Sequence, residues 1–252
     1  MPLQPGPALA VALVLLVAMA VAASAVGGLR RGRAIGVAAL RAVVQLALVA
    51  LVITAVLSHL VWSALFAALM FGVATATSAR RVEAPRRWPW VALALAAGVL
   101  PVLAVVFLSG AVPWNGPSLV PVAGIIIGGT MSAHSLAGRR AFAALRDEVG
   151  SYEAGLSIGL TRAQAVTEVI ERRLPEALVP GLDQTRTVGL VTLPGAFVGV
   201  LLGGGTPLQA GAAQILVLVG LLAAQTTAVV VAHRLIRSAR LLPDDLALRL
   251  IA

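Results

Sequence analysis

Residues 207–232 read PLQAGAAQILVLVGLLAAQTTAVVVA, a stretch without a charged residue that ends directly before His233 and Arg234. A helix of this length, rising 1.5 Å per residue, is long enough to cross the ~30 Å hydrocarbon core of a bilayer. Six further apolar blocks precede it, at 8–27, 34–57, 61–79, 89–109, 118–137 and 187–203. The sequence therefore predicts an all-α integral membrane protein, a bundle of about seven transmembrane helices.

Composition supports this fold class. Of the 252 residues, 60% are hydrophobic and 12% are charged, whereas a soluble domain is about half apolar and a quarter charged. The net charge of +9 lies between the apolar blocks, so we expect the partner to be the lipid bilayer and not nucleic acid. Because the chain has no cysteine, thiol nucleophiles, disulfides and cysteine metal sites are excluded.

Arginines gather in alternate connections between the blocks. They lie at 30–33, 80–87, 139–186 and 234–249, while the other connections and the first six residues carry no Arg, Asp or Glu. Positively charged loops remain on the cytoplasmic side of a membrane. We therefore expect a multi-pass protein of the cell membrane (inner or plasma membrane), with its N-terminus outside and its C-terminus in the cytoplasm.

Few polar or sulfur-containing side chains lie within the blocks: Arg41, Gln45, Met131, His134 and Gln214 are the candidates for a substrate path. Arg41 either snorkels to the interface or precedes the start of its helix. The glutamines either form interhelical hydrogen bonds or line the path. His134 either bonds to a neighbouring helix or is a ligand for the substrate. All ten acidic residues lie outside the blocks, which argues against a carboxylate proton relay.

Small residues recur at four-residue spacing in the fifth and sixth blocks. Gly124 and Gly128 share one helix face, and so do Gly195, Gly199 and Gly203. Such faces allow helices to approach closely. They are interpreted as packing within the chain, with a dimer seam or a transport path as alternatives. Pro121 and Pro194 should interrupt the backbone hydrogen bonds of these two helices.

Residues 138–186 form the longest segment outside the membrane and are too few for a catalytic domain with its own core. Gly150 and Gly159 are expected to end short helices. Thr161 and Gln164 have the spacing of a capping box, which starts another helix. The result is a helical elbow between the fifth and sixth helices. It either docks into a partner protein or lies on lipid headgroups or on its own bundle.

The stretch Glu153-Ala154-Gly155-Leu156-Ser157-Ile158-Gly159 resembles the loop of ABC-transporter permeases that docks on the ATPase. A longer match resembles the FetB-type permeases, a family that includes a bacterial permease assigned to iron export and plant aluminium-tolerance proteins. Its residues are Leu178, Pro180, Asp183, Gln184, Thr185, Val188-Gly189-Leu190-Val191, Leu193-Pro194-Gly195, Gly199, Gly203, Gly204, Pro207 and Gln214-Ile215. Upstream, Arg41-Ala42, Gln45-Leu46 and Gly124 to Met131 continue it. The chain departs from the family pattern at Gly129, at the apolar run 196–200 and at Ala213.

The resemblance implies that residues 1–252 are a single permease domain, with 138–186 as its coupling segment. It implies a permease homodimer that exports a metal ion (iron-like) or a small solute, with ATP and Mg²⁺ bound by a separate ATPase subunit. The chain itself has no phosphate-binding loop and no lysine to complete one, so we expect no cofactor and no catalytic residue of its own. The coupling residues would be Glu153, Ala154, Gly155, Gly159, Thr161 and Arg162. An ATPase-independent channel or scaffold and a membrane-embedded enzyme are the alternatives.

Overall fold

A computed structural model describes residues 6–251 of the chain. The protein divides into two compact units, Met1–Val56 and Leu57–Ala252. The described residues form helices, and the single β-type contact among them is the isolated bridge between Val188 and Thr192. Six helices are long and apolar enough to cross a membrane, which confirms an all-α multi-pass membrane protein. A single domain over 1–252 stays a prediction.

The first unit holds α1 (Pro7–Val26) and nearly all of α2 (Gly32–Ser58). The turn between the two helices is closed by Ser24, whose hydroxyl accepts a hydrogen bond from the backbone N–H of Arg31 at 3.0 Å. Ser24 is the one buried residue described in α1, and none of α2 is buried. The outward leucines and valines of both helices suit a lipid environment, where exposed apolar surface carries no cost.

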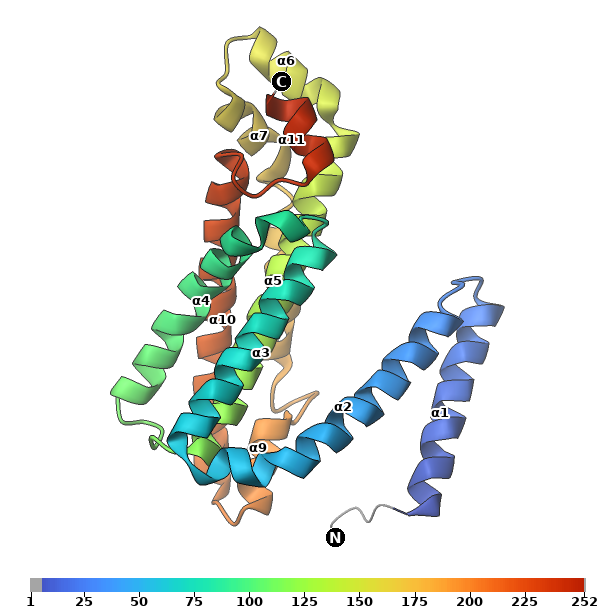
Figure 1. Ribbon diagram of the computed structural model, residues 1–252, viewed down its shortest axis with the longest axis vertical. Coiled ribbons are helices and arrows are strands. Elements are labelled where there is room, and N and C mark those ends of the chain that lie inside the picture. Colours follow the sequence, from blue (N-terminus) through green and yellow to red (C-terminus); the bar gives the residue numbers. More distant parts are fainter. Residues whose placement is uncertain (1–5, 252) are drawn as a thin grey trace. The chain divides into compact units, whose positions relative to one another are not determined.

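In the second unit, α3 (Leu60–Arg81), α4 (Trp88–Leu108), α5 (Gly116–Asp147) and α10 (Pro207–Arg237) pack along one another (Figure 1). Two glycines permit close approaches between these long helices. A Cβ atom on Gly98 of α4 would overlap the backbone oxygen of Ala224 on α10. A Cβ atom on Gly129 of α5 would overlap the side chain of Leu221. Bare backbone at these crossings lets the helices gain van der Waals contact.

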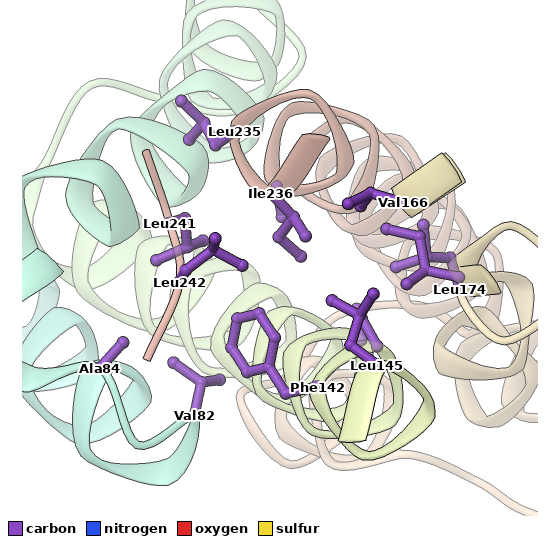
Figure 2. Packing of buried hydrophobic residues seen from close by; sticks show 14 of the residues in the cluster. Val82, Ala84, Phe142, Leu145, Val166, Leu174, Leu235, Ile236, Leu241 and Leu242 are labelled. Carbon is purple, nitrogen blue, oxygen red and sulfur yellow. The ribbon is translucent and has the colours of Figure 1, made fainter. Parts of the chain in front are cut away.

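The elbow segment extends one end of this bundle. It consists of α6 (Val149–Ser157), α7 (Arg162–Ile170), the short 3₁₀ helix η2 (Pro175–Leu178) and α8 (Val179–Thr187). Figure 2 shows how Val166 and Leu174 of the elbow face Leu145 of α5 and Ile236 of α10 within one buried cluster. Burying each such side chain contributes roughly 1.5–3 kcal/mol at a water-exposed end of the protein. The elbow is thus fixed to both α5 and α10.

The block at 187–203 differs from the single helix expected there. Only α9 (Gly195–Leu202) is helical, and its eight residues span about 12 Å, too short to cross a bilayer. Pro194 precedes the helix as its N-cap, because proline has no N–H to continue a helix. Gly189, at a φ of +83°, turns the chain back so that its N–H bonds to Thr192 O at 2.9 Å.

The chain nevertheless passes from the elbow end of the unit to the opposite end between α8 and α9, and α10 then returns (Figure 1). This pass is a broken one, made of two short helices joined by non-helical residues 188–194. Non-helical backbone at membrane depth is tolerated only where protein surrounds it or where it lines a cavity. The described residues thus form six long helices where seven were predicted, with α8 and α9 in place of the sixth, and a seventh membrane crossing stays a prediction.

The Arg-bearing connections of the second unit gather at one end. Arg86, in the 3₁₀ helix η1 (Pro85–Arg87), pairs with Asp244 of α11 (Asp244–Ile251) at 3.2 Å. Arg146, at the end of α5, pairs with Glu83 at 2.8 Å. Three arginine-rich segments that are distant in sequence thus share one end, as their alternation in the sequence predicts. The side of the membrane that this end faces stays a prediction.

Candidate functional site

A cavity of about 940 Å³ lies beside the discontinuous pass. Its walls come from the start of α5, from Pro194 and α9, and from the first half of α10. Pro117 and Pro121 keep part of the α5 wall free of N–H groups, and Gly195 and Gly199 keep the α9 wall flat. The volume falls within the roughly 300–1,000 Å³ of small-molecule sites.

Most of the lining is apolar, and its polar side chains are Ser118, Gln184, Gln209 and Gln214. Gln214 is only 4% exposed, and its Oε1 accepts a hydrogen bond from the backbone N–H of Phe197 at 3.3 Å. Gln209 Oε1 accepts from the N–H of Thr206 at 2.9 Å, as part of a capping box that starts α10. Both contacts identify which end of each amide is the oxygen.

Of the side chains proposed for a substrate path, only Gln214 lines this cavity. His134 is fully buried elsewhere, with Nδ1 2.8 Å from Ser78 Oγ, which lies 2.9 Å from Ser135 Oγ. These contacts join α3 to α5, so His134 has the interhelical role that was one of its two predicted alternatives. His134 Nε2 is buried without a partner among the described residues.

The remaining three path candidates have different environments. Met131 packs beside the buried cluster between α3, α4, α5 and α10. Arg41 and Gln45 lie on α2 in the first unit, where both side chains are exposed. Together the described residues contain no group of three or more His, Cys, Asp or Glu residues that could hold a metal ion. A role for these three residues in transport stays a prediction.

The glycines selected by spacing have several environments. Gly195 and Gly199 line the cavity, and a Cβ atom at either would meet nothing within 4 Å. A Cβ at Gly124 would lie 2.8 Å from Met70 Cε on α3, whereas one at Gly128 would meet open space. Gly203 ends α9 as its C-cap. Close crossings of the long helices use Gly98 and Gly129, which glycine spacing does not reveal because neither has another glycine four residues away.

The elbow places its predicted coupling residues at two depths. Glu153, Ala154, Thr161 and Arg162 are exposed, and Gly155 is buried, where an added Cβ would lie 3.3 Å from the Cβ of Ala165. Gly159 has a φ of +93°, which favours glycine and reverses the chain between α6 and α7. Thr161 and Gln164 form the predicted capping box. The conformation of the turn between α6 and α7 is thus set by Gly159 and by the cap of α7.

A second, smaller cavity of about 520 Å³ lies between this elbow and α11. Glu153, Leu156 and Arg162 line it together with Arg249 and Leu250 of the C-terminal helix. α11 was not expected from the sequence as part of this surface. The sequence indicates this helix only weakly: Leu246 and Leu250 are four residues apart, and two aspartates lie in its first turn.

α11 is held to the bundle by specific bonds. Tyr152 of α6 donates from its hydroxyl to the backbone oxygen of Leu250 at 3.0 Å, in a buried position. Arg146 donates to both carboxylate oxygens of Asp245, and this hydrogen bonding holds the pKa of Asp245 below its usual value. The elbow and α11 therefore form one continuous surface at the end of the bundle.

A family model described as "Uncharacterised protein family (UPF0014)" matches residues 8–240. The UPF0014 membrane protein STAR2 of Oryza sativa subsp. japonica is 32% identical over 86% of this chain and 77% of its own. Protein ALUMINUM SENSITIVE 3 of Arabidopsis thaliana is 31% identical over 62% of this chain and 58% of its own. The probable iron export permease protein FetB of Escherichia coli K12 is 33% identical over 57% of this chain and 54% of its own. The chain spans less than two thirds of the last two relatives. No solved structure matches it.

Proposed function

Because the chain belongs to the UPF0014 family of membrane proteins, we propose that it is the membrane-spanning permease subunit of an ABC transporter. In this proposal a separate cytoplasmic subunit binds ATP and Mg²⁺ and hydrolyses the ATP. The permease functions as a homodimer above two such subunits. The cargo is a metal ion or a small solute, and the name of the FetB relative favours iron export within that range.

The observation that carries the proposal is the connection between the elbow and the cavity walls. α7 buries Val166, Val169 and Ile170 in the cluster that also holds residues of α5 and α10. The same two long helices supply cavity residues, such as Pro121 and Gln214, toward their opposite ends. A displacement of the elbow would therefore move both walls of the cavity, because packed interiors transmit strain.

The exposed side of the elbow is suited to a protein partner. Ile158, at its tip, is 81% exposed, and Leu156 is 37% exposed. They lie near the oppositely charged Glu153 and Arg162, both exposed. Apolar anchors bordered by charges are typical of surfaces that bind other proteins. We assign this surface to the ATPase subunit, with Gly155 and Gly159 setting its shape.

The proposal is tested by purifying the chain with a candidate ATPase subunit and reconstituting both in liposomes. We expect stable co-purification and ATP hydrolysis that responds to the permease. Arg162→Ala should weaken capture of the ATPase, while the matched variant Arg81→Ala, an exposed arginine at the end of α3, should not. Solute movement without any ATPase subunit would instead support a passive channel and would overturn the proposal.

A further inference from the structure

Two glutamines of α10 present hydrogen-bond donors in the wall of the membrane cavity. Gln209 and Gln214 already use their carbonyl oxygens to accept bonds from the backbone N–H groups of Thr206 and Phe197. Their NH₂ groups remain, and Gln214 Nε2 forms no hydrogen bond with any residue that the structure describes. Gln214 as a whole is 4% exposed and lines the cavity, so a largely buried side chain offers a free donor in the cavity wall.

The first turn of α9 adds further donors to the same cavity. Its N-cap is Pro194, which supplies no capping side chain. The first N–H groups of a helix have no acceptor within the helix, and Gly195 and Ala196, the first two residues of α9, both line the cavity. The positive end of the helix dipole is directed to the same place.

The cavity lining offers few ligands for a metal ion, since its remaining polar side chains are Ser118 and Gln184. None of the described residues that line the cavity is charged, and none is His, Met or Cys. Proteins bind transition-metal cations such as ferrous ion mainly through carboxylate, imidazole or sulfur ligands. Transfer of an unpaired charge to an apolar site costs far more than hydrogen bonds to neutral amides return. The walls from Val122, Ile125 and Leu218 instead favour apolar surface.

We propose that this cavity binds an uncharged organic molecule that presents oxygen acceptors to Gln214 and to the first turn of α9, and that it does not bind a bare divalent cation. The inference deepens the proposed permease function and rests on it only in treating the occupant as cargo. If iron is carried, it enters this cavity as a neutral, oxygen-ligated chelate with an organic exterior.

The test uses the purified permease alone, in detergent and without an ATPase subunit. The natural chain has no cysteine, so Ala213→Cys introduces a single thiol in the cavity lining. Ala223→Cys is the matched control, an exposed position on the same helix that does not line the cavity. The rate of maleimide labelling is measured with uncharged iron(III) tris(acetohydroxamate) and, separately, with ferrous ion alone.

We expect the chelate to slow labelling of the Ala213→Cys protein and to leave the Ala223→Cys protein unchanged, with no effect of ferrous ion on either. Adding Gln214→Leu should raise the chelate concentration needed for half-protection about tenfold, the equivalent of one buried hydrogen bond. Gln184→Leu, at an exposed position of the lining, should raise it severalfold and tests the site even if the Gln214 variant fails to fold.

Protection by ferrous ion that depends on Gln214 would overturn the inference, and so would a failure of the chelate to protect. Equal protection of both thiols would also overturn it, because the chelate would then act by nonspecific association. Protection without any effect on ATP hydrolysis in the reconstituted complex would leave the cavity assignment intact and would contradict the transporter proposal instead.

Discussion

Arg146 donates two hydrogen bonds to the carboxylate of Asp245, from Nε at 2.8 Å and from Nη2 at 3.1 Å. Nη2 of the same guanidinium also lies 2.8 Å from Glu83. One arginine at the end of α5 thereby ties the connection between α3 and α4 to the C-terminal helix. The elbow begins directly after α5, so this pair lies at the junction through which any movement of the elbow would pass.

Asp245→Asn should loosen α11 with only a small effect on overall stability. The Asp245 side chain is 49% exposed, and exposed ion pairs contribute less than about 1 kcal/mol. We expect a fall of a few degrees in the thermal unfolding midpoint, smaller at high salt because salt screens the pair. The control is Asp183→Asn, which removes the more exposed pair with Arg186 at 3.5 Å and should change the midpoint less.

The same pair predicts a dependence of stability on pH. The pKa of Asp245 is lowered in the folded protein, first by the hydrogen bond from Arg146. A carboxylate with a depressed pKa stabilises the fold above its unfolded pKa of about 3.9, and this contribution is lost as pH falls through the folded value. Urea unfolding of the natural chain and of Asp245→Asn should therefore converge below about pH 4. A constant difference at all pH values would contradict this assignment.

Gly98→Ala should disrupt the crossing of α4 and α10. Its Cβ would overlap the backbone oxygen of Ala224, and backbone cannot move aside as a flexible side chain can. Overpacking of this kind costs about 1–3 kcal/mol, so we expect a lower yield of monodisperse protein and a lower unfolding midpoint. Gly72→Ala on α3 is the matched control, because its Cβ would meet nothing within 4 Å. It should be neutral or slightly stabilising, since alanine favours helix.

Thr161→Ala should weaken the start of α7. Thr161 Oγ1 accepts from the N–H of Gln164 at 3.3 Å in the capping box, and loss of such an N-cap costs about 1 kcal/mol. Hydrogen exchange should accelerate severalfold at the first amides of α7. Thr167→Ala is the control within the same helix, where the hydroxyl only bonds back to Ala163 O. Equal acceleration in both variants would show that the cap has no special role.

Much of the architecture could be predicted because it depends on local sequence. An uncharged block such as 207–232 is apolar over the length of a bilayer whatever its neighbours are, and it forms a helix to satisfy its backbone. The capping box at Thr161 and Gln164 is equally local, and so is the break at Pro194. The alternation of arginine-rich and arginine-free connections predicted that three arginine-rich connections lie at the same end of the protein. Each membrane crossing places the next connection on the opposite side.

The candidate site depended on contacts between distant segments. Spacing alone could not distinguish Gln214, which lines the cavity, from His134, which bonds to Ser78 on α3. It also could not show that Gly195 faces a cavity while Gly98 and Gly129 hold the helix crossings.

The apolar blocks and the charges of their connections were therefore determined by the sequence itself, since apolar length and charge act residue by residue. The tertiary structure decided that the block at 187–203 would form a short α9 beside a cavity rather than a seventh continuous helix. The cavity beside α9 needs walls from α5 and α10, and such a site is a property of packing between segments far apart in the chain.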